Sequence, residues 1–239
     1  MIKLNQIKDK LSNKGKYWIA FTGDSITSTE WVHPNWREII QYVLQEEMTS
    51  LLHGDWKTSE WGIKGFNFGY DGSTTKDILN KVDSIKIINP DLVIGLMGGN
   101  DAPLGVSVSE SVENISKIVE KLNTEVVWCN STPAGFGSNK NAEYKPYAKA
   151  FMEMNQMKNL QKINMFEVYQ KYPTEQFFTF VSEENIVEGV KEGETDLIHP
   201  NQLGNAYIAK IILNEVFDIE FDPQGYWQST LQGEKYPKY

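Results

Sequence analysis

The feature that most constrains the fold is an unbroken apolar run in the first half of the chain. Asp91–Met97 follows Asn89-Pro90, a pair that ends the helical pattern before it. A run without polar alternation predicts a strand that is covered on both faces, as strands of parallel sheets are. Parallel strands need long crossover connections, usually helices. The run therefore predicts a parallel sheet packed between helices.

Strand-like and helix-like stretches alternate along the rest of the chain. This order predicts a parallel sheet with right-handed crossovers and helices on both faces, an α/β fold. Strands are expected at 17–21, 65–68, 91–97, 125–130 and 164–168, and helices over the apolar repeats of 39–51, 78–85, 112–122, 147–157 and 201–217, the fourth beginning near Pro146.

The organisation predicted is one domain over residues 1–239. The chain is 40% hydrophobic, which is enough for a sizeable core, and no internal repeat or linker divides it. Residues 1–16 form a polar lead-in that could be helical. Residues 218–239 are expected to be a C-terminal tail, either packed on the domain or loose. No element is predicted for 170–195.

Charge and cysteine content exclude several classes of function. The net charge of −9 argues against nucleic acid and against an anionic membrane as the main partner. The one cysteine, Cys129, allows neither an internal disulfide nor a thiolate zinc site, and its apolar neighbours predict a buried, inert thiol. Because no apolar run has the length of a signal peptide core or a membrane span, a cytoplasmic protein without membrane insertion is expected.

A candidate nucleophile follows the first predicted strand. Gly23-Asp24-Ser25 comes directly after Tyr17–Phe21 and precedes a helical pattern. A strand that turns at a glycine and offers a serine before a helix presents a hydroxyl beside free backbone N–H groups. The tripeptide alone is equally consistent with a capped turn in which Ser25 or Thr27 is the helix cap.

Three later turns carry further candidates. Gly72 follows the second predicted strand, Asn100 follows the third, and Asp196 and His199 precede the last helix. The carboxyl ends of parallel strands share one edge of an open sheet, so these turns are expected to meet there. Each also has a purely structural interpretation: an unusual backbone angle for Gly72, a turn residue for Asn100 and a helix start for His199.

Taken together, the four blocks resemble the SGNH (GDSL-type) hydrolases. The resemblance implies a three-layer α/β/α fold of the flavodoxin-like kind, a five-stranded parallel sheet, ester hydrolysis, and no metal or cofactor. It implies that Ser25 is the nucleophile, that His199 and Asp196 are the base and its orienting carboxylate, and that Gly72 and Asn100 join Ser25 in the oxyanion hole. The blocks are Gly23-Asp24-Ser25, an Asn-x-Gly-x-x-Gly-x-Thr-Thr pattern from Asn67, Gly98-Gly99-Asn100-Asp101, and Asp-x-x-His from Asp196.

The chemistry of these residue types agrees with the roles that the resemblance implies. An alcohol is a poor nucleophile near neutral pH and needs a neighbouring base, for which histidine is suited. Two backbone N–H groups and the Asn100 amide could stabilise a tetrahedral intermediate. The Gly-x-Ser-x-Gly pattern of another hydrolase fold is not met, because Thr27 stands at its second glycine.

Three functions remain open. The first is hydrolysis of small or medium acyl esters, an O-acetyl group on a carbohydrate being one such ester. The second is a longer-chain, lipase-like esterase or thioesterase. The third is a non-catalytic carbohydrate-binding module on the same fold. The tryptophans and charged residues of 52–66 favour a polar, aromatic surface and hence carbohydrate esters.

Aromatic residues and a histidine near the candidate site have two interpretations each. Trp31, Trp36, Trp56 and Trp61 belong either to the core or to the wall of a pocket, and at least half are expected in the core. His33 lies close to Ser25 in sequence, and a surface position is expected for it.

Overall fold

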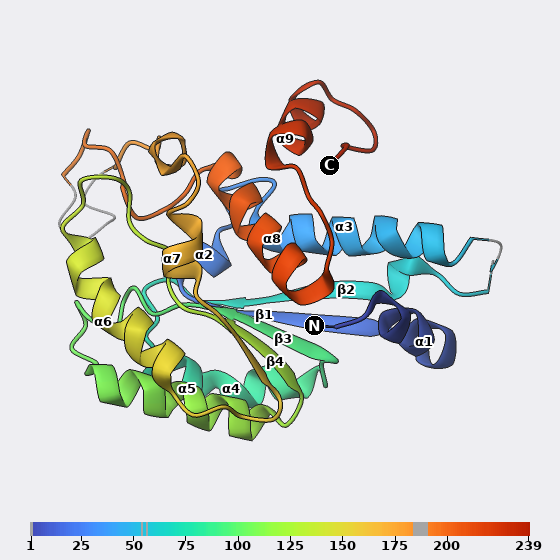
Figure 1. The fold of residues 1–239 in the computed structure, drawn as a ribbon, viewed down its shortest axis with the longest axis horizontal. Helices are drawn as coiled ribbons and strands as arrows, with labels where there is room; N and C mark the ends of the chain where they lie inside the picture. The colour runs from blue at the N-terminus through green and yellow to red at the C-terminus, as the bar shows by residue number, and fades with distance from the viewer. Residues whose placement is uncertain (1, 54, 56, 184–190) are drawn as a thin grey trace.

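The protein folds around a five-stranded parallel sheet. The computed structural model describes residues 2–53, 55, 57–183 and 191–239 (Figure 1). The strand order is β2-β1-β3-β4-β5, the flavodoxin-like doubly wound order. The predicted α/β class and the five parallel strands are therefore confirmed. The strands are β1 Tyr17–Gly23, β2 Ile63–Gly69, β3 Leu92–Leu96, β4 Glu125–Cys129 and β5 Leu160–Ile163.

The central strand is the one that the unbroken apolar run predicted. Every residue of β3 is buried, and β3 pairs with β1 on one side and β4 on the other. In this register Gly23 lies opposite Leu96, so the ends of β1 and β3 are neighbours. The loops that follow these two strands consequently begin side by side.

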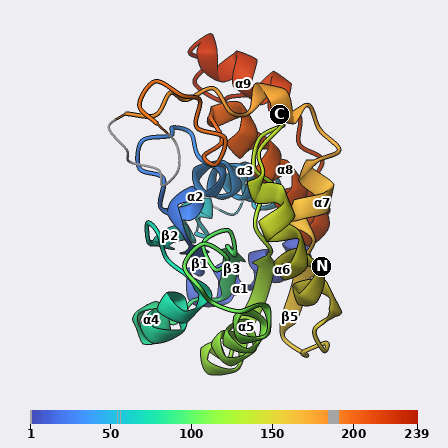
Figure 2. The same cartoon turned by 90° about the vertical axis from the view of Figure 1, so that its left-hand side faces the viewer.

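Helices cover both faces of the sheet. Figure 1 shows α4 and α5 below the strands and α3 and α8 above them, and Figure 2 shows the same layers from the side. One buried cluster joins the sheet to α1, α3 and α8, and a second joins it to α4, α5 and Phe151 of α6. The long helices are α1 Leu4–Lys14, α3 Trp36–Leu51, α4 Thr75–Ile87, α5 Val108–Leu122, α6 Lys140–Glu153 and α8 Gln202–Phe217.

The remaining elements are short and mostly lie in loops. They are the helices α2 Ser25–Ser28, α7 Met165–Tyr169 and α9 Pro223–Leu231, with single 3₁₀ turns η1 Glu60–Gly62 and η2 Thr174–Gln176. Within the described ranges, no helix combines the length and the apolarity that crossing a membrane requires.

The fifth strand was predicted at the wrong place. It spans Leu160–Ile163, and most of the expected strand 164–168 is the helix α7. Short apolar runs fit a buried helix turn as well as a strand. Asn130, at the end of β4, decides between them: its side chain accepts from the Phe166 N–H at 2.9 Å and donates to the Asn164 side chain at 3.0 Å.

The start of α6 was also predicted wrongly. The helix begins at Lys140 and carries Pro146 in its interior. A proline inside a helix has no backbone N–H, so one backbone hydrogen bond of the helix is missing. Tyr144, Ala148 and Phe151 are buried along one face of α6, and this packing offsets the lost bond.

A packed helix lies near each end of the chain. The lead-in forms α1, which buries Ile7 and Leu11. The tail forms α9 and packs on the domain: Tyr226 is buried and its ring lies 6.0 Å from that of Tyr42 on α3. Asp222 supplies the N-cap for α9, since its carboxylate accepts from two backbone N–H groups.

The thiol of Cys129 is buried as expected, whereas of Trp31, Trp36 and Trp61 one lies in the core and two lie on the surface. Cys129 is fully buried, and burial raises the pKa of its thiol. Trp36 lies in the core, but Trp31 and Trp61 are exposed on the surface. Trp56 lies outside the described residues.

We expect the Asn130 contacts to contribute measurably to stability. Asn130→Ala leaves buried donors and acceptors around α7 without partners, and this should lower the free energy of unfolding by about 1–3 kcal/mol. Asn80 on the exposed face of α4 is the matched control, and Asn80→Ala should change it by less than about 0.5 kcal/mol. Urea unfolding monitored by circular dichroism measures both. Equal stability of the two variants would contradict the role given to Asn130.

Candidate active site

The structure brings a serine, a histidine and a carboxylate from distant parts of the sequence into one chain of contacts. The Ser25 Oγ lies 2.8 Å from Nε2 of His199. Nδ1 of the same ring lies 2.6 Å from Oδ2 of Asp196. Ser25 is the first residue of α2, directly after β1, and the other two lie in the segment that leads into α8. With a proton on Nδ1, Nε2 is free to accept the serine proton.

Local backbone contacts fix the carboxylate of this chain. The second oxygen of Asp196, Oδ1, accepts from the backbone N–H groups of Ile198 and His199 at 2.8 and 3.1 Å. Burial raises the pKa of Asp196, but the hydrogen bonds from the ring and backbone of His199 outweigh it and the net pKa is lowered. The carboxylate therefore stays ionised and holds the imidazole in one orientation.

The turn that presents Ser25 depends on a close approach of backbone. At Gly23 a Cβ atom would overlap the carbonyl oxygen of Leu96 at the end of β3 and the hydroxyl of Thr27. That hydroxyl donates to the same carbonyl at 3.1 Å. Asp24 then caps α2, since its side chain accepts from the Ile26 N–H at 3.1 Å. These contacts seat the one-turn helix on the carboxyl end of β3.

Asn100 lies beside Ser25 and is anchored to the loop after β2. Its side-chain nitrogen donates to the carbonyl oxygen of Ser73 at 3.1 Å. The neighbouring Asp101 is fully buried and accepts from the backbone and hydroxyl of Thr75 at 2.8 and 2.9 Å. The loops that follow β2 and β3 are thereby joined. Among the described residues, the second N–H of the Asn100 amide has no acceptor, so it can bind one from a substrate.

Gly72 lies in the turn between β2 and α4. Its φ of 66° is in the left-handed region, which glycine adopts without strain. Ser73, the next residue, accepts from Asn100, and Asp71, the preceding one, hydrogen-bonds to Ser28 of α2. The turn is thus tied to both the candidate nucleophile helix and the candidate oxyanion donor.

A small pocket opens between the candidate nucleophile and Asn100. Its cavity volume is about 10 Å³, close to the ~10–15 Å³ that one water molecule needs. The residues that line it are Asp24, Ser25, Ile26, Gly99, Asn100, Ser131, Thr132, Pro133, Ala134, Tyr144 and Ile198.

An exposed tryptophan borders the candidate base. The ring of Trp31 lies edge-on to that of His199, with centroids 5.9 Å apart, and 51% of the residue is exposed. His33, two residues later, lies on the surface and pairs with Glu38 at 3.2 Å. Of these two residues, Trp31 therefore contacts the candidate base, whereas His33 pairs with a residue of α3.

Asp24 is a buried acid of the Gly23-Asp24-Ser25 block for which the sequence predicted no separate role. Burial beneath the turn raises the pKa of its carboxyl to about 6, although the Ile26 N–H and the charge of His199 act in the opposite direction. Only the tertiary structure could reveal this, because the same Asp in an open turn would face water.

The sequence matches a family model and a curated protein. Residues 21–207 match the model of the GDSL-like Lipase/Acylhydrolase family. The chain is 26% identical over 238 residues to the GDSL esterase/lipase CPRD49 of Arabidopsis thaliana, a match that covers 88% of this chain and 83% of that protein.

Solved structures share the fold. The chain is similar to Axe2, an acetylxylan esterase from Geobacillus stearothermophilus, with a TM-score of 0.57 and 17% identity over 87% of this chain and 95% of that one. It is also similar to a member of the lipolytic protein G-D-S-L family from Veillonella parvula, with a TM-score of 0.55 and 17% identity over 84% and 98% of the two chains.

We expect Asp24 to make stability depend on pH. Its folded pKa of about 6 lies above the ordinary 3.8, so the stability it contributes is complete below pH ~4 and is lost as the pH rises through 6. Asp24→Asn cannot ionise, and its free energy of unfolding relative to wild type should rise by about 3 kcal/mol between pH 4 and 7. Chemical unfolding at several pH values measures this. Asp83→Asn, at an exposed position, is the control. If the free energy of unfolding changed with pH in the same way for wild type and Asp24→Asn, the assignment would be refuted.

Proposed function

Because the chain belongs to the GDSL-like Lipase/Acylhydrolase family and is a carboxylic ester hydrolase, we propose that Ser25, His199 and Asp196 are its catalytic triad. We propose further that it cleaves short acyl esters, in particular O-acetyl groups on carbohydrate. The observation that carries the proposal is the unbroken chain of contacts from the Ser25 hydroxyl through His199 to Asp196.

The geometry supports a two-step reaction. His199 Nε2 accepts the proton as Ser25 Oγ attacks the ester carbonyl, and Asp196 stabilises the charged imidazolium. The ring then gives the proton to the leaving alcohol, which leaves an acyl group on Ser25. Water then gives a proton to the same ring and attacks the acyl-serine. As the bond to Ser25 breaks and the acid leaves, the ring returns this proton to Ser25 Oγ.

The developing oxyanion needs donors on the side of Ser25 that faces Asn100. We propose the second N–H of the Asn100 amide and the backbone N–H of Ser25 as two of these donors, because both residues line the same pocket and Ser25 begins α2. Gly72 is proposed as the third donor, because its turn is fixed by contacts to both neighbouring loops. Fixed donors of this kind require no reorganisation when the charge forms.

The pocket beside Ser25 favours a short acyl group. Its cavity volume of about 10 Å³ leaves no room for a long acyl chain, and the side chains of Pro133, Ala134 and Ile198 supply an apolar lining. Each further methylene of a longer acyl chain would have to be buried outside this pocket to gain the usual ~0.8 kcal/mol of hydrophobic free energy. The alternative, an esterase or thioesterase for longer chains, requires an additional apolar surface.

An exposed indole beside the base favours a carbohydrate alcohol. The indole of Trp31 is half exposed and lies edge-on to the ring of His199, which would protonate the leaving alcohol. Aromatic faces give large contact area at low cost in conformational entropy. The acetylxylan esterase Axe2, whose fold this chain shares, acts on an acetylated polysaccharide by name. The alternative of a non-catalytic carbohydrate-binding module is disfavoured by the intact Ser25–His199 contact.

The triad proposal predicts unequal effects of three substitutions. Ser25→Ala and His199→Ala should each remove nearly all hydrolysis of p-nitrophenyl acetate, because the two act as one unit. Asp196→Ala should retain more, since it acts through the ring. Asn100→Ala should lower kcat by roughly 10²–10³ with little change in KM. Steady-state kinetics on variants shown to be folded by circular dichroism measures this, and wild-type turnover by Ser25→Ala would overturn the proposal.

The substrate proposal predicts a preference for acetylated sugars that depends on Trp31. Acetyl and butyryl aryl esters should be cleaved faster than esters of about ten carbons. Trp31→Ala should lower kcat/KM on acetylated xylo-oligosaccharides by roughly 3- to 10-fold but not on p-nitrophenyl acetate. Trp61→Ala is the matched control. Trp61 is also exposed, but it lies just before β2, at the amino ends of the strands, whereas Ser25 follows the carboxyl end of β1. A steady rise of kcat/KM through the long chains would favour the lipase-like alternative.

A further inference from the structure

The helix that carries Ser25 is too short to hold itself in place. α2 has four residues, Ser25–Ser28, and so closes a single helical turn. One turn gains few hydrogen bonds for the backbone freedom it loses, so isolated turns are unstable in water. Its N-terminal end is fixed by Asp24 and β3. Its C-terminal carbonyl groups need partners from elsewhere.

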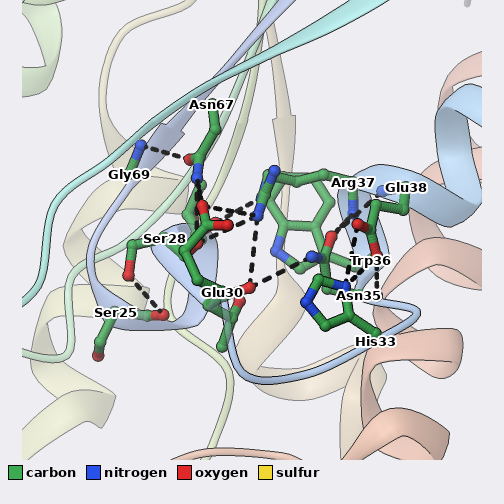
Figure 3. Close-up of polar contacts among 12 residues, drawn as sticks. Ser25, Ser28, Glu30, His33, Asn35, Trp36, Arg37, Glu38, Asn67 and Gly69 are labelled. Atoms are coloured by element: carbon green, nitrogen blue, oxygen red, sulfur yellow. Dashed lines mark hydrogen bonds and ion pairs between the residues drawn. The ribbon is translucent and has the colours of Figure 1, made fainter.

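Those partners come from the start of the next helix, α3. The indole nitrogen of Trp36 donates to the carbonyl oxygen of Ile26 at 3.1 Å. The Asn35 side chain donates to that of Thr29 at 3.2 Å. Both donors are buried, and Figure 3 shows them beside the turn that follows α2.

Arg37 makes the largest share of these contacts. Its Nε donates to the carbonyl oxygen of Thr27 at 2.6 Å, and its Nη2 donates to those of Ser28 and Thr29 at 3.1 and 3.5 Å. Only 11% of the Arg37 side chain is exposed. Burial lowers the pKa of the guanidinium, while Glu30 and Glu38 act to raise it. One cation thus binds three successive carbonyl groups at the end of α2.

Two further side chains complete the arrangement. Asn67 of β2 donates to the carbonyl oxygen of Ser28 at 3.0 Å and to the Glu30 carboxylate at 2.7 Å. Glu30 in turn lies 4.0 Å from Arg37 Nη2. Figure 3 shows the side chains of Arg37, Glu30 and Asn67 around the C-terminal end of α2, while Ser25 lies at its N-terminal end.

The position of Arg37 is unfavourable for its own helix. Arg37 is the second residue of α3, where the helix dipole disfavours a positive charge. It is also the only arginine in the chain, which otherwise uses lysine. A guanidinium presents several donors in a rigid fork, whereas a lysine ammonium is a flexible point charge. Arg37 therefore stabilises the end of α2 through its contacts with the carbonyl groups there, and it does not stabilise the start of α3, its own helix.

We propose that Arg37 is a positioning residue that holds α2, and with it the Ser25 hydroxyl and backbone N–H, in the reactive geometry. This inference rests on the proposed function of Ser25. Without the guanidinium, the carbonyl groups of Thr27, Ser28 and Thr29 lose a buried donor and α2 can shift. A displacement of about 1 Å at a reacting group costs roughly 10²-fold in rate.

The test compares Arg37→Met and Arg37→Lys with a matched control. Lys162 on β5 donates to the carbonyl oxygens of Met152 and Met154 at 2.7 Å each, far from Ser25. Lys162→Met therefore also removes a cation from partly buried backbone carbonyl groups. We expect lower melting temperatures for Arg37→Met and Lys162→Met. Only Arg37→Met should lose kcat on p-nitrophenyl acetate, by roughly 10- to 100-fold with KM changed less than about 3-fold.

A second readout follows the nucleophile directly. The rate of inactivation by a phosphonate ester, which reacts at the serine, should fall in Arg37→Met by about the same factor as kcat. Arg37→Lys keeps the charge but not the fork, so its kcat should lie between wild type and Arg37→Met. If Arg37→Met does not fold, the Lys variant alone decides.

Two outcomes would overturn the inference. One is wild-type kcat in the folded Arg37 variants. The other is an equal loss of kcat in Lys162→Met, because that would trace the effect to stability alone. Absence of esterase activity in the wild-type protein would instead refute the proposed function, so the two failures are distinguishable.

Discussion

The site depends on the close approach of β1 to the end of β3. At Gly23 the chain passes so near the Leu96 carbonyl that a side chain would overlap it, and the Thr27 hydroxyl donates to the same oxygen. This approach seats α2 on the central strand and places Ser25 next to the loop that carries Asn100. A larger residue at Gly23 would separate the serine from Asn100 even if every other contact remained.

Two buried carboxyl groups near the serine have opposite electrostatic environments. Asp196 accepts from two backbone N–H groups and the imidazole, and its net pKa is lowered despite burial. Asp24 has few compensating donors, and burial raises its pKa to about 6. The first can therefore support a charged imidazole, whereas the second acts on the stability of the turn. The two acids lie close together but have separate roles because their hydrogen-bond partners differ.

The side chains that bind the carbonyl groups at the end of α2 do not contact the substrate themselves, but they support the residue that does. Asn35, Trp36 and Arg37 begin α3, and each side chain donates to a carbonyl group between Ile26 and Thr29. The start of one helix thus completes the end of another. Of these three, only Arg37 combines a charge with several donors, which makes its removal the most informative change.

The sequence by itself determined the alternation of strands and helices and the parallel sheet. Ser25 and Asn100 could be expected at one edge because the turns that follow parallel strands meet there. His199 follows no strand, and it was predicted from the Asp-x-x-His pattern of the family that the chain resembles. Contacts between elements decided the rest. Asn130 made α7 a helix where the sequence favoured a strand, and packing carried α6 past Pro146. The contact of Trp31 with His199, the burial of Asp24 and the carbonyl partners of Arg37 all depend on other elements of the fold, which no local pattern encodes.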